Sequence, residues 1–310
     1  MAFFSILAAV VLEHVRPRKR PLPHYQAYAS YTHWLEGKFN AGEFNHGVIA
    51  WTAAVVPLLF GVWLIGYMLG SSSSVLAWGW NVAVLYFTLG FKYFSDDAEA
   101  IARLLRAGEI EQARSHLASW RRNDTSSGDS AGFTQDEISR VTIEQVIAAS
   151  QRQMFGVLMW FVLLSPWGPV GAVLYRAASI LARRWAQTAG AFGDFAQQAF
   201  HVINWLPARL TALTYAIAGD FEDAMYCWRT QAPSWPEQEE GVVLAAGAGA
   251  MGVRIGLPLT AAGELGYRPE LGLNQAAEPD LIDSAVSMVW RGLTVWLIVG
   301  LLLLVAGWAA

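Results

Sequence analysis

The side chains best suited to chemistry gather in one short polar stretch, which contains Arg121, Arg122, Asp124 and Thr125. Two arginines can grip a phosphate or a carboxylate with paired hydrogen bonds. A carboxylate such as that of Asp124 can hold a metal ion that also contacts phosphates. The stretch is therefore either a binding site for an anionic or phosphate-bearing ligand, or only a solvated helix end and turn.

Three further polar residues stand in or beside apolar segments. Glu144 lies near the start of an apolar run, where an acid either reaches water or is functional. Asn204 and Arg209 flank Trp205-Leu206-Pro207. Both are costly to bury unpaired. They therefore either bind a partner or a ligand, or lie at the depth of the lipid headgroups, where Arg209 extends to water.

A glycine motif and the single cysteine point to packing rather than chemistry. Gly247 to Gly252 matches G-x-G-x-x-G, but nucleotide binding needs a strand before it and a helix after it. Helix-like apolar residues surround the motif, so close packing of helices is favoured. Cys227 is the one cysteine, which predicts a small buried side chain and no internal disulfide. The sequence contains no Cys/His pattern with zinc spacing and no P-loop.

The elements that position these residues are predominantly apolar. Of 310 residues 55% are hydrophobic and 15% charged, against about 25% charged in soluble domains. A helix needs about 20 apolar residues to cross a bilayer. We therefore predict an all-α polytopic membrane protein, residues 1–310 forming one membrane-embedded domain. Spans are expected near 48–69, 75–91 and 289–308, with shorter apolar segments at 2–12, 154–181, 200–218 and 241–256.

The distribution of basic residues predicts the orientation. Lys and Arg cluster in 16–46 and in 92–152, and such loops stay in the cytoplasm. Residues 92–152 are expected to form a cytoplasmic helical insertion that includes a hairpin, with Thr134 and Glu137 capping a helix. The apolar segment 154–181 is interrupted at Ser165 to Pro169, which indicates either a kinked span or, as the later arginines favour, a re-entrant hairpin. The chain would lie in the inner membrane, in contact with lipid, with its main polar loops cytoplasmic.

A net charge of −4 argues against nucleic-acid binding, because such proteins present a basic face. A transporter is also disfavoured, since the sequence shows no repeated halves.

Several short segments carry a family resemblance, and their order along the chain strengthens it. The most specific is Asn204-Trp205-Leu206-Pro207-Ala208-Arg209-Leu210. The others are Leu22-Pro23-His24, Ala107-Gly108-Glu109, Arg122-Asn123-Asp124-Thr125, Ile143-Glu144 and Gly252-Val253-Arg254-Ile255-Gly256. In this order they resemble the cobalamin-biosynthesis membrane proteins CobD or CbiB, including their AmpE-like relatives.

The resemblance implies an ATP-dependent synthase that joins adenosylcobyric acid to aminopropanol or its phosphate. The carboxyl group must be activated before the amine attacks it. Asp124 and Glu144 are then the catalytic candidates, and ATP with Mg²⁺ would be required, although no metal ligands are assigned. The ligand-binding candidates are His24, Arg121, Arg122, Thr125, Asn204, Arg209 and Arg254.

This sequence departs from the family pattern at polar positions. Ala148 to Gln153 replaces a stretch with Glu and Asp, Phe200 and His201 replace two Asp, and Ala178-Ser179 replaces Asn-Thr. Trp167 to Val170 looks more like AmpE, which is regarded as a signalling modulator. The leading hypothesis is therefore an inner-membrane ligand-binding or signalling protein with an incomplete synthase site. The alternatives are a working synthase and a membrane scaffold.

Overall fold

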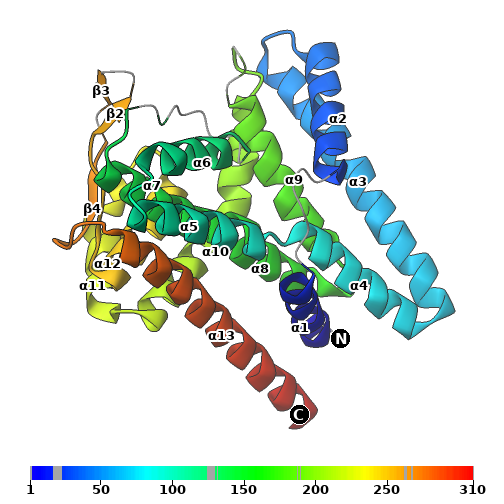
Figure 1. The fold of residues 1–310 in the computed structure, drawn as a ribbon. Coiled ribbons are helices and arrows are strands. Elements are labelled where there is room, and N and C mark those ends of the chain that lie inside the picture. The colour runs from blue at the N-terminus through cyan, green and yellow to red at the C-terminus, as the bar shows by residue number, and fades with distance from the viewer. Residues whose placement is uncertain are drawn as a thin grey trace. The chain divides into compact units, whose positions relative to one another are not determined.

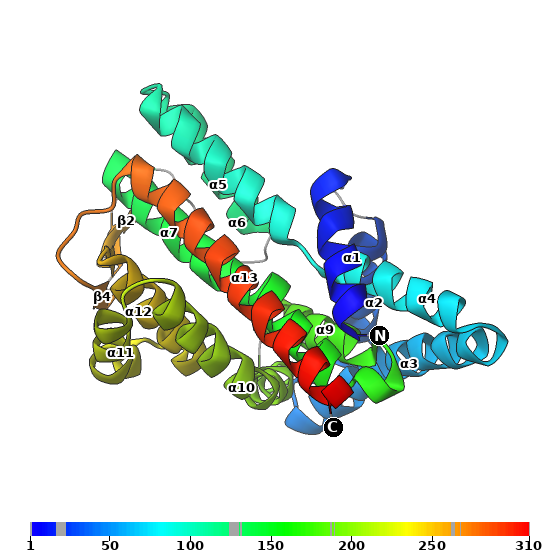
Figure 2. The same cartoon turned by 90° about the horizontal axis from the view of Figure 1, so that it is seen from below.

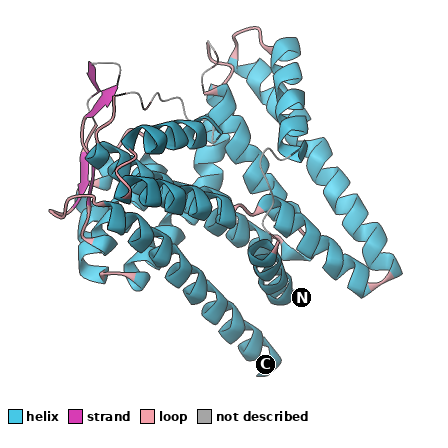
Figure 3. Cartoon of the chain, in the orientation of Figure 1, coloured by secondary structure: helices cyan, strands magenta, loops and turns pink. Residues whose placement is uncertain are grey.

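The computed structural model describes residues 2–16, 23–123, 130, 132–186, 188, 190–261, 264–266 and 268–309. Helices make up nearly all of it, and four three-residue strands stand together between residues 254 and 272 (Figures 1 and 3). The predicted all-α class is confirmed. The chain divides into two compact units, and each is described by itself. Unit 1 is Met1–Gly90 with Arg152–Trp205, and unit 2 is Phe91–Gln151 with Leu206–Ala310.

Unit 1 is a group of packed helices with one buried apolar core. Its elements are α1 (Ala2–Val15), α2 (Pro23–Phe39), α3 (Phe44–Ser72), α4 (Ser74–Thr88), α8 (Gly156–Leu163), the 3-10 turn η2 (Ser165–Trp167), α9 (Val170–Trp185) and the first part of α10 (Asp194–Ala218). Leu35 of α2, Ala50 and Ala54 of α3, and Leu181 and Trp185 of α9 share one buried apolar core. Small residues on α3 let these helices approach closely.

The predicted interruption of the 154–181 segment is present. α8 ends at Leu163, η2 follows, and Gly168 adopts a positive φ of 77° before α9 begins. A Cβ on Gly171 would come within 1.9 Å of the carbonyl oxygen of Trp160, so α9 starts in direct contact with α8. The preference for a re-entrant hairpin over a kinked span stays a prediction.

Unit 2 packs its helices against one another along their lengths. Its elements are α5 (Phe91–Arg106), α6 (Ile110–Asn123), α7 (Gln135–Ser150), the rest of α10, α11 (Phe221–Thr230), the 3-10 turn η3 (Ala232–Ser234), α12 (Gln238–Met251), the strands and α13 (Pro279–Ala309). α5, α7 and α13 lie side by side (Figures 1 and 2). After α7 the chain continues as a π-helical segment, η1 (Gln151–Phe155), of which only Gln151 belongs to unit 2.

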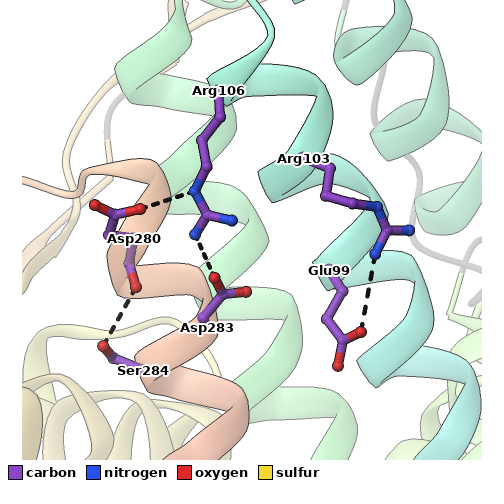
Figure 4. Close-up of polar contacts among 6 residues, drawn as sticks. All are labelled: Glu99, Arg103, Arg106, Asp280, Asp283 and Ser284. Carbon is purple, nitrogen blue, oxygen red and sulfur yellow. Dashed lines mark hydrogen bonds and ion pairs between the residues drawn. The ribbon is translucent and has the colours of Figure 1, made fainter.

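Helices α5 and α6 form the expected hairpin, which turns at Gly108 with φ of 76°. At its C-terminal end, next to this turn, α5 is bound to the start of α13 by an exposed ion cluster (Figure 4). The Nε of Arg106 lies 2.8 Å from Asp280 Oδ1, and its Nη2 donates to Asp283. Anionic side chains are favourable in the first turn of a helix, where the backbone N–H groups point outward.

The polar helix α7 is buried along nearly its whole length. It begins with the capping box predicted from the sequence. The Thr134 hydroxyl accepts from the Glu137 backbone N–H, and the Glu137 carboxylate accepts from the Thr134 N–H at 2.7 Å. Because Arg140 and Glu144 follow on the same helix, α7 carries charged groups into the interior of unit 2.

The segment after α12 forms short antiparallel strand pairs. β1 (Arg254–Gly256) pairs with β4 (Glu270–Gly272), and β2 (Leu259–Ala261) pairs with β3 (Glu264–Gly266). The segment has a distant anchor. Gln231 donates to the Gly272 carbonyl at 2.9 Å and accepts from its N–H at 2.6 Å, a contact that local sequence does not predict.

Within the described part of the chain, four helical runs are long and apolar enough to cross a membrane. They are Phe44–Ser72, Ser74–Arg106, Gln135–Leu163 and Pro279–Ala306. The spans expected near 48–69 and 75–91 fall within two of these runs, and the span expected near 289–308 overlaps the run that ends at Ala306. α3 and α13 also expose large apolar side chains such as Phe60 and Leu302, as helices in lipid do. The assignment of individual spans and of one membrane-embedded domain stays a prediction.

Candidate functional site

Glu144 forms the centre of a buried polar cluster in unit 2. Its Oε1 accepts the backbone N–H of Gly256 at 2.9 Å, and its Oε2 accepts from the guanidinium of Arg268. The side chain is only 7% exposed. A carboxylate bound in this way is held in one orientation. Glu144 therefore fixes the start of the β segment to the middle of α7.

Arg140 stands one turn before Glu144 and binds the same residue of β1. Its Nη1 donates to the Gly256 carbonyl at 2.7 Å, and its Nε lies 3.0 Å from Asp136. Helix α7 thus binds both the N–H and the C=O of Gly256. A Cβ on Gly256 would lie 2.0 Å from the Pro269 carbonyl oxygen, and φ is +74°, so glycine is required here.

The backbone next to this position is strained. Leu257 has φ of 63°, and no other non-glycine residue in the described ranges has a positive φ. Such a conformation costs roughly 1 kcal/mol or more and persists only where surrounding contacts enforce it. The bonds from α7 to Gly256 supply that enforcement. Strain of this kind gathers at ligand-binding and catalytic sites, which makes the segment a candidate for function.

The cluster reaches solvent at Arg268. This side chain is 24% exposed, and its guanidinium carbon lies 4.9 Å from the centre of the Trp235 ring. A guanidinium stacked on an aromatic face keeps its edge available for further hydrogen bonds. We call Arg140, Glu144, Trp235, Gly256 and Arg268 the Gly256 cluster.

Arg254 extends from the same strand. It is half-buried and pairs across the sheet with Gly272, while the next residue, Ile255, is fully buried on the opposite face. Among the described side chains, none forms a hydrogen bond or ion pair with the guanidinium of Arg254. Arg140 and Arg268 are already paired with Asp136 and Glu144, so Arg254 is the arginine of this segment that could bind an anionic ligand.

The remaining candidates are more dispersed. Arg121 lies near the end of α6 with its guanidinium 5.8 Å from the centre of the Phe133 ring, and Arg122 is exposed. Asp124 and Thr125 lie outside the described residues. His24 stands in the first turn of α2, and its side chain also lies outside the described part. The structure therefore does not describe the Arg-Asp-Thr stretch as a site.

Asn204 and Arg209 both lie on α10 but in different units, and they are described separately. In unit 1, Asn204 is buried, and its Oδ1 accepts the Tyr175 hydroxyl at 2.8 Å. It therefore has the protein partner that its burial requires. In unit 2, Arg209 is half-buried.

The glycine motif packs helices, as predicted. A Cβ on Gly247 would lie 3.0 Å from Ile147, and one on Gly249 would lie 2.5 Å from the Asp223 carbonyl oxygen. Cys227 is fully buried, again as predicted, and burial together with the charge of Asp223 raises the pKa of its thiol. Among the described residues, no group of three or more His, Cys, Asp or Glu could hold a metal ion.

Sequence reasoning missed Arg140, Trp235 and Arg268. Arg140 was detectable, because it stands four residues before Glu144 and so shares one face of a helix with it. Arg268 and Trp235 gave no such signal. They reach Glu144 only because the β segment folds back onto α7.

Comparison with known proteins identifies relatives over nearly the whole chain. The family described as CobD/Cbib protein matches residues 6–289. The Cobalamin biosynthesis protein CobD of Stutzerimonas stutzeri is 34% identical over 99% of this chain and 98% of its own length. The protein of the same name in Chromobacterium violaceum is 38% identical over 69% of this chain and 67% of its own length. The one in Streptococcus sanguinis is 27% identical over 94% of this chain and 93% of its own length.

No solved structure gives a significant match. The family match nevertheless covers nearly the whole chain, including α7 and the β segment. The resemblance noted from the sequence is confirmed, and the chain belongs to the CobD/CbiB family of cobalamin-biosynthesis membrane proteins.

Proposed function

We propose that this chain catalyses an amide-forming step of cobalamin biosynthesis, in which adenosylcobyric acid is joined to aminopropanol or its phosphate at the expense of ATP. The full-length similarity to proteins named for cobalamin biosynthesis supports this hypothesis over a signalling role. The observation that carries it is the Gly256 cluster, a buried carboxylate with two arginines beside strained backbone.

The proposed reaction needs two steps. The terminal phosphoryl group of ATP passes to the carboxylate, which gives an acyl phosphate and ADP. The amine nitrogen then attacks the acyl carbon, phosphate leaves, and the nitrogen gives up a proton. Negative charge is present or develops at the phosphates in both steps, so positively charged donors held in place supply much of the catalysis.

The residues of unit 2 suit these demands in different ways. Arg254 offers a guanidinium without a protein partner in the described ranges, and it is our first candidate for binding phosphate or carboxylate oxygens. Arg268, stacked on Trp235, is the second. Both Glu144 oxygens are already occupied, which favours a positioning role for this residue over that of a general base. Asp124 stays the candidate for proton transfer or metal binding.

Complementation tests the proposal directly. The chain is expressed in a bacterial strain that lacks its cobinamide-forming synthase and must grow on cobyric acid. We expect growth, and we expect Arg254→Gln to abolish it while membrane abundance is unchanged. A well-expressed wild-type chain that supports no growth, and accumulates no cobinamide, would argue against a synthase.

A second candidate is a ligand-binding or signalling protein that keeps the family frame without catalysis. The occupied oxygens of Glu144 and the absent carboxylates at 148–153 and 200–201 favour it. It predicts saturable binding of cobyric acid by the purified protein without consumption of ATP. Turnover of ATP that depends on both cobyric acid and the amine would exclude it.

For either function we propose an inner-membrane location with the Gly256 cluster on the cytoplasmic side. The basic residues of 92–152 support this orientation. Glu270 is exposed, and a cysteine introduced there should react with a membrane-impermeant reagent added from the cytoplasmic side and not from the other side.

A further inference from the structure

The seam between α2 and α9 in unit 1 contains polar groups that the proposed function does not use. The Nε of Arg176 donates to the Tyr25 hydroxyl at 2.7 Å, and its guanidinium carbon lies 5.0 Å from the centre of the Tyr25 ring. Further along both segments, Thr188 donates to Glu36 at 2.9 Å. The two contacts follow the same chain direction, so α2 runs parallel to the segment formed by α9 and the residues just after it, and α3 packs against both helices.

This register brings a second pair of residues to the same seam. Tyr28 stands one turn after Tyr25 on α2, and Ser179 stands one turn after Arg176 on α9. Residues three apart on a helix share a face. Tyr28 also packs against the core that contains Ala177 and Leu181 of α9. Its hydroxyl and that of Ser179 therefore belong to the seam that the Arg176–Tyr25 contact opens.

Three donors in this seam are buried and unused. Within the described part of the chain, the Nη1 of Arg176, the hydroxyl of Tyr28 and the hydroxyl of Ser179 find no hydrogen-bond partner. The Ser179 side chain is completely buried. Burying an unpaired polar group costs about 1–3 kcal/mol, so a protein rarely keeps three together without an occupant.

The three unused donors have the chemistry of an anion site. Arg176 is positively charged and is paired with no carboxylate among the described residues. Burial, with a smaller effect of the Tyr31 hydroxyl, raises the pKa of Tyr28, so its hydroxyl stays protonated and able to donate. A carboxylate presents two accepting oxygens and a phosphate three or more, so three donors match a phosphate better.

We propose that the α2–α9 seam of unit 1 binds a phosphate group through Arg176, Tyr28 and Ser179. The phosphate belongs either to a soluble small molecule or to a lipid headgroup, and the chemistry of recognition is the same. The site is built from residues of unit 1 alone and does not rest on the proposed synthase activity.

The test uses the full-length protein purified in a lipid-free, phosphate-free detergent solution. Its unfolding temperature is measured as inorganic phosphate replaces chloride at constant ionic strength. We expect a saturable rise in the wild type. Arg176→Gln and Tyr28→Phe should each raise the half-saturating phosphate concentration roughly tenfold or more, since each removes a hydrogen bond to the anion.

A matched control lies on the same helix. The Tyr31 hydroxyl already donates to the Ala53 carbonyl at 3.0 Å, so it has no free donor for a phosphate, and Tyr31→Phe should leave the phosphate response unchanged. Ser179→Ala removes a single oxygen and keeps the test valid if Arg176→Gln fails to fold. Acetate in place of phosphate should give a clearly weaker response.

A second arm separates the two sources. If added phosphatidylglycerol raises the unfolding temperature in an Arg176-dependent manner, and phosphate then has no further effect, the occupant is a lipid headgroup. A response to phosphate in lipid-free detergent alone assigns a soluble ligand. The proposal is overturned if neither phosphate nor lipid has an effect, if the effect survives Arg176→Gln and Tyr28→Phe, or if acetate matches phosphate.

Discussion

The Gly256 cluster of unit 2 and the α2–α9 seam of unit 1 use similar side chains in opposite ways. In the Gly256 cluster, the carboxylate of Glu144 and the guanidinium groups of Arg140 and Arg268 have partners within the protein. In the seam, donors of Arg176, Tyr28 and Ser179 are buried without partners in the described part of the chain.

The difference separates positioning from binding. A buried charge that is paired holds the backbone in place, and its removal leaves its partners buried without an acceptor or a counter-charge. A buried donor without a partner destabilises the ligand-free fold, and this cost is offset only when a ligand binds. We therefore expect substitutions in the Gly256 cluster to destabilise the protein, and substitutions in the seam to change ligand binding instead.

The largest effect is expected for Glu144→Ala. It leaves the Gly256 N–H and the Arg268 guanidinium without their acceptor inside unit 2. The free energy of unfolding should fall by about 3 kcal/mol, as when one member of a buried ion pair is removed. The measurement is denaturant or thermal unfolding in detergent.

The lone cysteine supplies the control for that experiment. Cys227 is fully buried, and burial raises the pKa of its thiol, so maleimide labelling of the native protein should be slow. Slow labelling of Glu144→Ala indicates that the variant is still folded when its stability is measured. Wild-type stability in a folded Glu144→Ala protein would show that the cluster does not brace the fold.

The next effect is expected for Gly256→Ala, which tests whether the cluster acts through the backbone. The added Cβ would lie 2.0 Å from the Pro269 carbonyl oxygen, at a φ of +74°. We expect a loss of roughly 2–3 kcal/mol, of which about 1 kcal/mol is conformational strain. Urea unfolding gives the value.

Gly252→Ala is the matched control, because it has nearly the same φ, +70°, but no atom nearer than 4.0 Å to the added Cβ. It should lose only the strain contribution, about 1 kcal/mol. Equal losses in the two variants would mean that contact with the Pro269 backbone is unimportant.

A smaller effect is expected in the seam. Ser179→Ala deletes an unpaired buried hydroxyl, so the ligand-free protein should unfold at the same free energy or gain up to about 1 kcal/mol. Denaturant unfolding in phosphate-free detergent solution measures this free energy. A clear loss of stability would mean that Ser179 has a structural partner, and the contrast between the two regions would fail.

The smallest effect is expected for Arg106→Gln, which calibrates the comparison. Arg106 binds Asp280 and Asp283, but all three side chains are well exposed (Figure 4). Exposed ion pairs contribute about 1 kcal/mol or less, and salt screens them. The free energies of unfolding of the wild type and Arg106→Gln should therefore differ slightly at low salt and become equal at high salt. A loss as large as that of Glu144→Ala would show that burial is not what distinguishes the Gly256 cluster.

The sequence predicted the features that depend on neighbouring residues. The break at Ser165 to Pro169, the hairpin at Gly108 and the Thr134–Glu137 cap are encoded locally, and each is present. Glu144 was recognised because an acid in an apolar run is conspicuous.

The contacts that complete each site are set by tertiary structure. Arg268 reaches Glu144 through a β segment held by Gln231, and Arg176 reaches Tyr25 through the parallel course of two helices. Neither pairing has a period or a motif in the sequence, so local patterns could not predict them.

Amide formation by the purified protein tests the central claim most directly. Adenosylcobyric acid, ATP and Mg²⁺ are incubated with aminopropanol or its phosphate in separate reactions, and product and ADP are quantified. We predict that the wild type forms product with matching release of ADP, and that folded Glu144→Gln is slower by about a hundredfold, as expected when a positioning contact is lost. Folded wild-type protein that consumes no ATP and forms no amide with either amine would contradict the account.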